Sequence, residues 1–200
     1  MTFPPRGSRE LRKGRFSQPG GLYFVTASTD QREKVFIHPE INRILREAIH
    51  WLEDKNKWDW RIYMIMPDHV HLLFQLGEGE TLASVMKSWK GYTAGKILKW
   101  LSGQECPSHQ AKAKDGQECP SHPTEENLCG RGLPTLFLPG GRGLPTPITH
   151  LWQEGYYDRF IRSEKELQEV IRYMAYNPVR AGLATQPEDY PYWKSKVEID

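Results

Sequence analysis

Residues 58–76 read WDWRIYMIMPDHVHLLFQL, and this stretch decides the fold because it holds two β-rich runs separated by a short break. In the second run, His69 and His71 share one face of a strand with period two. Apolar residues alternate with them and are expected to face a core: Val70, Leu72, Phe74 and Leu76. The break at Pro67-Asp68 is short enough to reverse the chain. The sequence therefore predicts an antiparallel hairpin whose inner strand carries both imidazoles on one face.

Two histidines at positions i and i+2 of a strand point the same way and can each give a nitrogen to one divalent ion. A third ligand must then come from elsewhere in the chain. The competing interpretation is a chance pair of histidines on a half-buried sheet. The spacing of His69 and His71 alone does not exclude that interpretation.

Length and composition indicate one domain that does not cross a membrane. The 200 residues carry a net charge of only +2 and no apolar run of membrane-spanning length. Residues 1–19 form a basic arm before a single domain at 20–200, and a polyanion such as DNA is a suitable partner for such an arm. We expect a cytoplasmic, nucleoid-associated protein. The basic residues of the arm are the first candidate DNA contacts: Arg6, Arg9, Arg12, Lys13 and Arg15.

The remaining elements alternate between strand and helix patterns. Residues 22–29 are β-rich, and a helix with apolar side chains at helical spacing starts near Pro39. A second helix starts at about Thr81, and the aromatic run 155–161 predicts the last strand. A third helix starts after Ser163 and should end at about Asn177, because the proline that follows disfavours helical geometry there.

The resulting order, β-α-β-β-α-(insert)-β-α, predicts an α+β fold. It is the order of a ferredoxin-like sandwich, an antiparallel sheet with helices on one face. An edge strand of such a sheet could pair with a second copy, so a homodimer is one expected assembly. Lysines of the second helix, Lys87 and Lys90 among them, could follow a nucleic-acid backbone, although a solvated helix face would look the same.

Residues 102–149 differ in composition from the rest of the chain. They are rich in Gly, Pro, Ser and Thr and contain GQECPSH at 103–109 and 116–122, and GRGLPT at 130–135 and 141–146. Little apolar surface is available there, so we expect a flexible insert. The duplicated heptapeptide supplies two Cys-x-x-His pairs that could bind zinc, although one duplication explains the pattern as well: Cys106, His109, Cys119 and His122.

The third helix carries a tyrosine and an asparagine that could face the histidine pair. Tyr173 lies about 110° from the centre of the apolar stripe, and Asn177 lies on the same flank. Their i, i+4 spacing could present a phenol and an amide oxygen together toward a metal on His69 and His71. The alternative is a border tyrosine with its hydroxyl in water and an asparagine that ends the helix.

Several stretches together resemble one family of DNA enzymes. The stretches are YFVT at 23–26, MPDHVHLLF at 66–74, LWQEGYYDRFIR at 151–162 and RYMAYNPVRAGL at 172–183. They resemble landmarks of the IS200-like transposases and of their REP-associated tyrosine transposase relatives, which belong to the HUH single-stranded-DNA nucleases. The resemblance implies that Tyr173 is the nucleophile and that Asn177 joins His69 and His71 as a metal ligand. The insert departs from the family pattern but leaves these motifs intact.

The same resemblance implies a function. It indicates a metal-dependent enzyme, using Mg²⁺ or Mn²⁺, that cleaves and rejoins single-stranded DNA beside palindromic hairpins through a 5′-phosphotyrosine. Two alternatives stay open: a hairpin-binding protein of the same fold that does not cleave, and a phosphoesterase that uses water. Rival tyrosines also exist, and the resemblance, not geometry, favours Tyr173 over them: Tyr92, Tyr156 and Tyr157.

Overall fold

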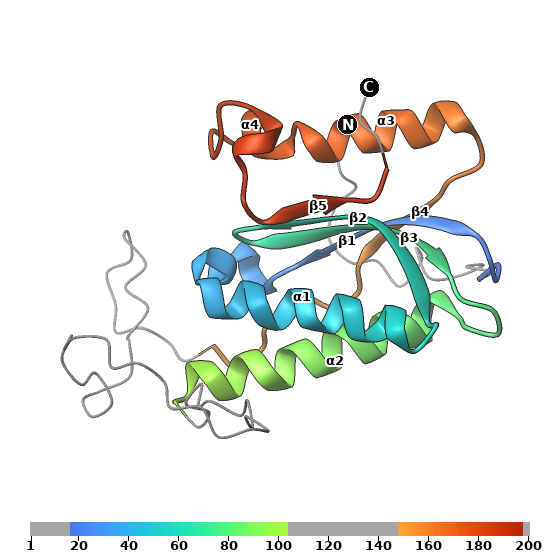
Figure 1. Ribbon diagram of the computed structural model, residues 1–200. Coiled ribbons are helices and arrows are strands. Elements are labelled where there is room, and N and C mark those ends of the chain that lie inside the picture. The colour runs from blue at the N-terminus through green and yellow to red at the C-terminus, as the bar shows by residue number, and fades with distance from the viewer. Residues whose placement is uncertain (1–16, 104–147, 198–200) are drawn as a thin grey trace, which may run out of the picture.

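The computed structural model describes residues 17–103 and 148–197, which form one antiparallel sheet covered by helices on both faces (Figure 1). The sheet order is β4-β1-β3-β2-β5. The α+β class and the ferredoxin-like element order are confirmed. The elements are β1 (Leu22–Ser28), η2 (Asp30–Arg32), η3 (Val35–Ile37), α1 (Pro39–Asp54), β2 (Trp58–Met66), β3 (His69–Leu76), α2 (Leu82–Leu101), β4 (Tyr157–Phe160), α3 (Glu164–Ala175), α4 (Asn177–Arg180), η4 (Pro187–Asp189) and β5 (Trp193–Ser195).

The hairpin predicted from residues 58–76 is present as β2 and β3. Met66 pairs with His69 across the turn, and the antiparallel register continues to Trp58 opposite Leu76. On its other edge β3 pairs with β1, where Thr26 lies opposite His71. β3 is therefore hydrogen-bonded on both sides at the centre of the sheet.

The lower face of the sheet in Figure 1 packs on α1 and α2. The apolar side chains of β3 that were predicted to face a core do so here: Val70, Leu72, Phe74 and Leu76. They meet the apolar stripe of α1, which includes Leu45 and Ile49. The two helices cover this face along its length, so it forms the larger hydrophobic core of the described part.

The upper face carries α3 and differs from the expectation that every helix lies on one face. Phe24, Met64 and Leu73 point upward from β1, β2 and β3 and pack with Ile171 and Met174 of α3. The reason is that these strands are apolar on both faces, as strands buried on both sides are. Reading the alternation of residues 69–76 as a half-buried strand missed the second core.

Pro178 begins a helix rather than only ending one. α3 stops at Ala175, Tyr176 caps it, and α4 starts at Asn177 with the proline in its first turn. A proline suits that position because its missing N–H would have no helical partner there. The chain therefore continues as a second short helix, which turns Asn177 back toward the sheet.

The C-terminal tail packs back on the domain. Tyr190 is 7% exposed, and its hydroxyl donates to the Ile65 carbonyl at 2.7 Å. Trp193 pairs with Met64, so β5 extends the sheet beyond β2. The sequence did not predict this strand because three residues are too few to show an alternation.

Part of the predicted organisation lies outside the described residues. The candidate contacts of the basic arm, Arg6, Arg9, Arg12, Lys13 and Arg15, lie there, as do residues 104–147 with both Cys-x-x-His pairs. The predictions for the arm, the insert and the zinc ligands therefore remain predictions. Within residues 17–103 and 148–197, no helix has the length and apolarity of a membrane span.

Candidate active site

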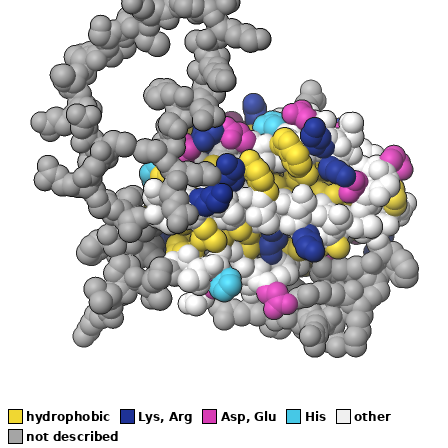
Figure 2. Space-filling model, turned by 90° about the horizontal axis from the view of Figure 1, so that it is seen from below, with side chains coloured by type: hydrophobic (Ala, Val, Ile, Leu, Met, Phe, Trp, Pro, Cys, Tyr) yellow, Lys and Arg dark blue, Asp and Glu magenta, His cyan; other side chains and the backbone are white. Residues whose placement is uncertain are grey.

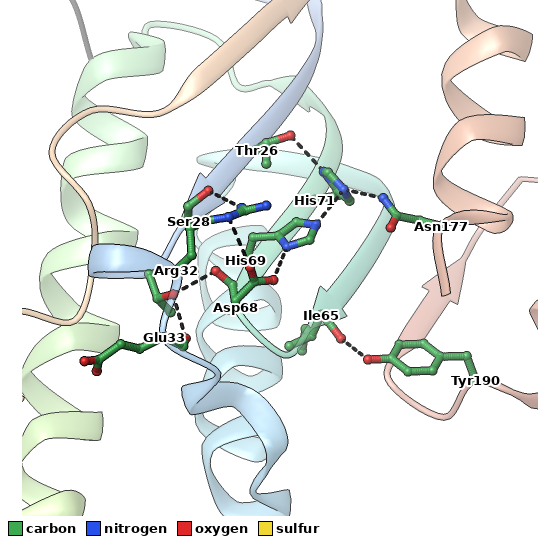
Figure 3. A network of polar contacts seen from close by, with 11 residues as sticks. Thr26, Ser28, Arg32, Glu33, Ile65, Asp68, His69, His71, Asn177 and Tyr190 are labelled. Atoms are coloured by element: carbon green, nitrogen blue, oxygen red, sulfur yellow. Dashed lines mark hydrogen bonds and ion pairs between the residues drawn. The ribbon is translucent and has the colours of Figure 1, made fainter. Parts of the chain in front are cut away.

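His69 and His71 lie side by side on the upper face of β3 (Figure 3). Their Nε2 atoms are 3.1 Å apart, and the rings meet nearly edge to face with centroids 4.6 Å apart. Both side chains are almost fully buried, His71 at 0% exposure and His69 at 9%. The strand alternation thus brings the two imidazoles together as the sequence predicted.

The other nitrogen of each ring contacts an oxygen that defines the tautomer. His69 Nδ1 lies 2.6 Å from Asp68 Oδ1, and His71 Nδ1 lies 2.8 Å from Thr26 Oγ1. An ionised carboxylate can only accept, so His69 carries its proton on Nδ1. A Thr26 hydroxyl that accepts from His71 gives the same tautomer there. Both Nε2 lone pairs then point at one another.

Asp68 is suited to this role because it stays ionised. Burial alone would raise the pKa of the Asp68 carboxyl, but the hydrogen bond from His69, the charge of His69 and the charge of Arg32 lower it overall. Arg32 Nε lies 3.1 Å from Asp68 Oδ2, while the other carboxylate oxygen contacts His69. A carboxylate behind a ligand histidine is the usual outer contact of a metal-binding imidazole.

His71 is held in the neutral form. Burial lowers its pKa well below the usual value. The charge of His69 when that ring is protonated, and the charges of Arg32 and Arg180, lower it further. The ring also stacks on Phe24, with centroids 5.4 Å apart and planes 29° apart. A neutral imidazole keeps its Nε2 lone pair available, which a metal ligand requires.

Asn177 completes the group from the first residue of α4. Its side-chain Nδ2 lies 2.7 Å from His71 Nε2, to which an N–H can donate. The amide oxygen and nitrogen exchange places by a half rotation of the amide, so the same side chain can instead present its oxygen to a cation. The break between α3 and α4 is what directs this side chain at the histidines.

Tyr173 lies beside the histidines on α3. Its ring centroid is 5.4 Å from that of His71 and 5.9 Å from that of Phe24. Burial raises the pKa of its phenol, while the charge of Arg180 and a hydrogen bond with Asn177 oppose that rise. The guanidinium of Arg180 lies 4.8 Å above the ring, and its Nη2 donates to the Tyr173 carbonyl at 2.7 Å.

The donor set fits a divalent ion. Two nitrogen ligands about 2.1 Å from a metal and at right angles to each other are about 3.0 Å apart, close to the 3.1 Å between the two Nε2 atoms. His71 Nε2 can accept from Asn177, but the two lone pairs still face each other at 3.1 Å, where a cation or a proton would relieve their repulsion. Among the described residues, no group of three His, Cys, Asp or Glu side chains could hold a metal. The side chain of Asn177, 2.7 Å from His71 Nε2, could supply a third ligand.

The predicted contacts on α2 lie elsewhere. α2 covers the lower face, so Lys87 and Lys90 are on the side of the sheet opposite the histidines. Lys90 Nζ donates to the carbonyls of Gln153, at 2.8 Å, and Gly155, at 2.5 Å, which ties α2 to the segment before β4. Figure 2, which views this lower side, shows basic side chains scattered among apolar ones. These lysines are therefore not part of the site around His71.

The rival tyrosines also separate by face. Tyr92 is 50% exposed on α2, and Tyr156 packs against the lower core. Tyr157 pairs with Thr26 and packs on the upper face, where its ring lies 6.3 Å from that of Phe24. Tyr157 is thus the one rival tyrosine of these three on the same side as the histidine pair.

Sequence reasoning missed four residues that support the site: Thr26, Arg32, Asp68 and Arg180. Asp68 offered a signal, because an acid directly before a ligand histidine is placed to hold its outer nitrogen. Thr26 could be found only from the register of β1 against β3. The two arginines follow no spacing rule, since one lies in a loop and the other beyond the break after α3.

The chain is similar in sequence to known proteins. Residues 20–112 match the family model described as "Transposase IS200 like", a range that contains both histidines and ends before α3. A candidate REP-associated tyrosine transposase of Haemophilus influenzae is 24% identical over 86% of this chain and 78% of its own length. The REP-associated tyrosine transposase of Escherichia coli is 20% identical over 89% of this chain and 78% of its own length.

A solved structure shows the same fold. The structure of a REP-associated tyrosine transposase bound to a REP hairpin matches with a TM-score of 0.58 and 18% identity, over 90% of this chain and 79% of that one. The match to the family model and the two relatives confirm that this chain resembles the IS200-like transposases. Its resemblance to the REP-associated tyrosine transposases in particular is also confirmed.

Proposed function

We propose that this protein is a metal-assisted endonuclease and strand transferase for single-stranded DNA, with Tyr173 as its nucleophile. The observation that carries the proposal is the convergence of His69, His71 and Asn177 within hydrogen-bond distance, with the Tyr173 ring 5.4 Å from that of His71. A phenol beside a cluster of neutral nitrogen ligands suits attack on a phosphodiester.

The substrate we propose is DNA with a hairpin flanked by a single strand. One relative of the same fold is described as bound to a REP hairpin, which supports this choice. The reacting phosphate must lie on the upper side of the sheet, because both histidines and Tyr173 face that side. A single strand is suited to this position, since its backbone can bend into a site beside the end of α3.

In the proposed reaction, Tyr173 Oη attacks the phosphorus of one phosphodiester. The bond from oxygen to phosphorus forms, and the bond from phosphorus to the 3′-oxygen of the preceding nucleotide breaks. The phenolic proton is lost, and the departing oxygen gains one to become a 3′-hydroxyl. The 5′-phosphate stays on Tyr173, so a second 3′-hydroxyl can reverse the step and join strands without a nucleotide cofactor.

The surrounding residues prepare this attack. Asp68 and Thr26 hold the outer nitrogens of the histidines, so both Nε2 lone pairs are directed at the ion site. Mg²⁺ or Mn²⁺ on His69, His71 and Asn177 would supply positive charge for the phosphate oxygens when bound. Arg180 opposes the effect of burial on the Tyr173 phenol, whose pKa is nevertheless raised. A raised pKa means that the phenol is neutral at physiological pH and loses its proton only during attack.

A covalent adduct tests the proposal directly. Wild-type protein, incubated with Mg²⁺ or Mn²⁺ and a labelled hairpin oligonucleotide with single-stranded arms, should become attached to the label. Tyr173→Phe removes one oxygen with almost no change in volume, so the adduct should disappear while folding and DNA binding persist. Tyr157→Phe is the matched control, since this tyrosine lies on the same face and should leave the adduct unchanged.

Each other outcome assigns a different activity. Binding without an adduct or cleavage would identify a non-catalytic hairpin-binding protein. Cleavage without an adduct would point to water as the nucleophile. An adduct that survives in Tyr173→Phe and is lost in Tyr157→Phe would keep the chemistry and contradict the choice of tyrosine.

A further inference from the structure

The loop after β1 holds two consecutive residues in a backbone conformation that L-amino acids rarely adopt. Gln31 has φ 51° and Arg32 has φ 61°, both in the left-handed region. Neither residue is glycine, so the conformation is strained and persists only because surrounding contacts enforce it. Such strain is found most often at functional sites, and its effect here is to turn the Arg32 side chain back over the end of β1.

Several of the contacts that hold the loop connect it to Asp68, at the turn of the hairpin. The backbone N–H of Thr29 donates to the Asp68 carbonyl at 2.9 Å, and its hydroxyl lies 2.9 Å from the same oxygen. Arg32 Nη1 donates to Ser28 Oγ at 2.8 Å, and its Nε contacts Asp68 Oδ2 (Figure 3). The Arg32 side chain is still 49% exposed, so its outer edge faces solvent beside the histidines.

A second guanidinium approaches from the other side. Arg180 lies over the Tyr173 ring and donates to the carbonyl of the same residue. Among the described residues, no carboxylate lies within ion-pair distance of Arg180, which differs in this respect from Arg159, paired with Glu166 on the same face. Within residues 17–103 and 148–197, its charge is thus not balanced by a carboxylate beside Tyr173.

The two arginines reach the site from separate elements. Arg32 contacts Asp68, whose other carboxylate oxygen contacts His69 Nδ1. Arg180 lies over the Tyr173 ring, whose centroid is 5.4 Å from that of His71. One cation therefore lies next to the histidine pair and the other next to the tyrosine. A region of concentrated positive charge is a binding site for an anion.

We propose that Arg32 and Arg180 form a two-sided phosphate site that holds the backbone of the DNA strand between His71 and Tyr173. This inference rests on the proposed function and adds two positioning residues to it. A guanidinium suits the task because its planar set of N–H donors matches the non-bridging oxygens of a phosphate. Arg32 is fixed by Ser28 and Asp68 and Arg180 by Tyr173, so both are preorganised before the strand arrives.

The test measures binding, so that it does not depend on cleavage. All proteins carry Tyr173→Phe, which leaves the Arg180 contact to the carbonyl of residue 173 in place. Arg32→Gln and Arg180→Gln are compared with Arg172→Gln, which removes an equal charge from an exposed position of α3. The probe is a fluorescent hairpin oligonucleotide with single-stranded arms, used unmodified or with one uncharged methylphosphonate placed at each arm position in turn.

We expect each of the two Gln variants to weaken binding of the unmodified probe about tenfold and to reduce the slope of log affinity against log salt by about 1. With a methylphosphonate at one particular position, each Gln variant and the parent protein should bind the probe equally well. The reason is that the uncharged group has already removed the contact between the arginine and that phosphate. Arg32→Lys should restore part of the affinity, since it keeps the charge without the planar fork. Thermal unfolding of each variant is measured in parallel to confirm that it folds.

Three results would overturn the inference. One is equal weakening for the unmodified and every modified probe, which indicates a structural role for the arginines. Another is an effect no larger than that of Arg172→Gln, and the third is no binding of the probe by the parent protein. Failure of the proposed function gives a different result. If the effect of the arginine variants depends on one phosphate position but the protein with Tyr173 forms no covalent adduct, the phosphate site stands and the proposed cleavage reaction is excluded.

Discussion

The two faces of the sheet are built from the same strands but do different work. Below, β3 meets α1 and α2 through apolar side chains alone, such as Leu72 and Phe74. Above, Leu73 packs under α3, while two residues earlier His71 faces the side chain of Asn177, at the start of α4. The lower face is covered along its length, whereas the upper helix ends beside the histidines. The candidate site therefore lies where one layer of the sandwich stops short.

The largest effect on stability should come from the lower face. Phe74→Ala removes a fully buried ring that contacts Trp58 and Tyr23, with centroids 4.7 and 6.4 Å away. We expect the free energy of unfolding to fall by about 4 kcal/mol, measured by urea denaturation. Activity per folded molecule should be unchanged at low temperature. A selective loss of DNA cleavage in a fully folded Phe74→Ala would show that the two faces are not separate.

The histidines should show the reverse pattern. His69→Ala and His71→Ala each remove a proposed metal ligand, so adduct formation should drop about a hundredfold or more. Hairpin binding should persist, because backbone contacts and not the ion supply most of the affinity. Single-turnover cleavage and fluorescence anisotropy measure the two quantities. Wild-type cleavage rates in either variant with added Mg²⁺ or Mn²⁺ would exclude this site.

A smaller effect is expected one contact further out. Asp68→Asn keeps the shape of the side chain but no longer requires a proton on His69 Nδ1, so Nε2 loses part of its basicity. We expect the affinity for Mn²⁺ to weaken about tenfold, and calorimetric titration measures this change. The matched control is Asp59→Asn. The Asp59 carboxylate contacts Arg61 at 3.0 Å and also Lys196, and it does not contact the histidines. Equal affinities in the two variants would contradict the role given to Asp68.

The smallest effect belongs to the tail that supports the upper face. Tyr190→Phe removes the hydrogen bond to the Ile65 carbonyl and should cost about 1 kcal/mol. Burial raises the pKa of Tyr190 to about 12, above the usual value of about 10. The folded state therefore holds this proton more tightly, and the stability it gives is present below about pH 10 and lost as pH rises toward 12. Urea titrations across that range should show a steeper loss in wild type than in Tyr190→Phe.

Strand periodicity was sufficient to predict the histidine pair, because a period of two fixes which side chains share a face. It was not sufficient to predict that helices cover both faces of the sheet. The alternation of residues 69–76 suggested one buried face, whereas Leu73 on the other face is also buried. Tyr173 was chosen by resemblance to a family and not by geometry. Tyr173 and Asn177 were expected on a single helix. In the structure they lie on two helices, α3 and α4, which are separated at Tyr176.

The outer contacts could not be predicted for a different reason. Arg32 reaches the site only because Gln31 and Arg32 adopt left-handed backbone conformations, which local sequence does not encode. Thr26 depends on a register between strands 45 residues apart in the chain. Such contacts are set by how distant elements close on each other, so they become visible only in three dimensions.

The central position of β3 in the sheet also affects how fast its backbone amides exchange with solvent. Its amides are bonded into the sheet from both neighbours, so deuterium should enter at His69 and His71 only when the sheet as a whole opens. α3 rests on the sheet through side chains, and its last turn, with Tyr173, should exchange by local fraying many times more often. The histidines would thus stay in place while the tyrosine moves, as the proposed transfer of one DNA end to another would require.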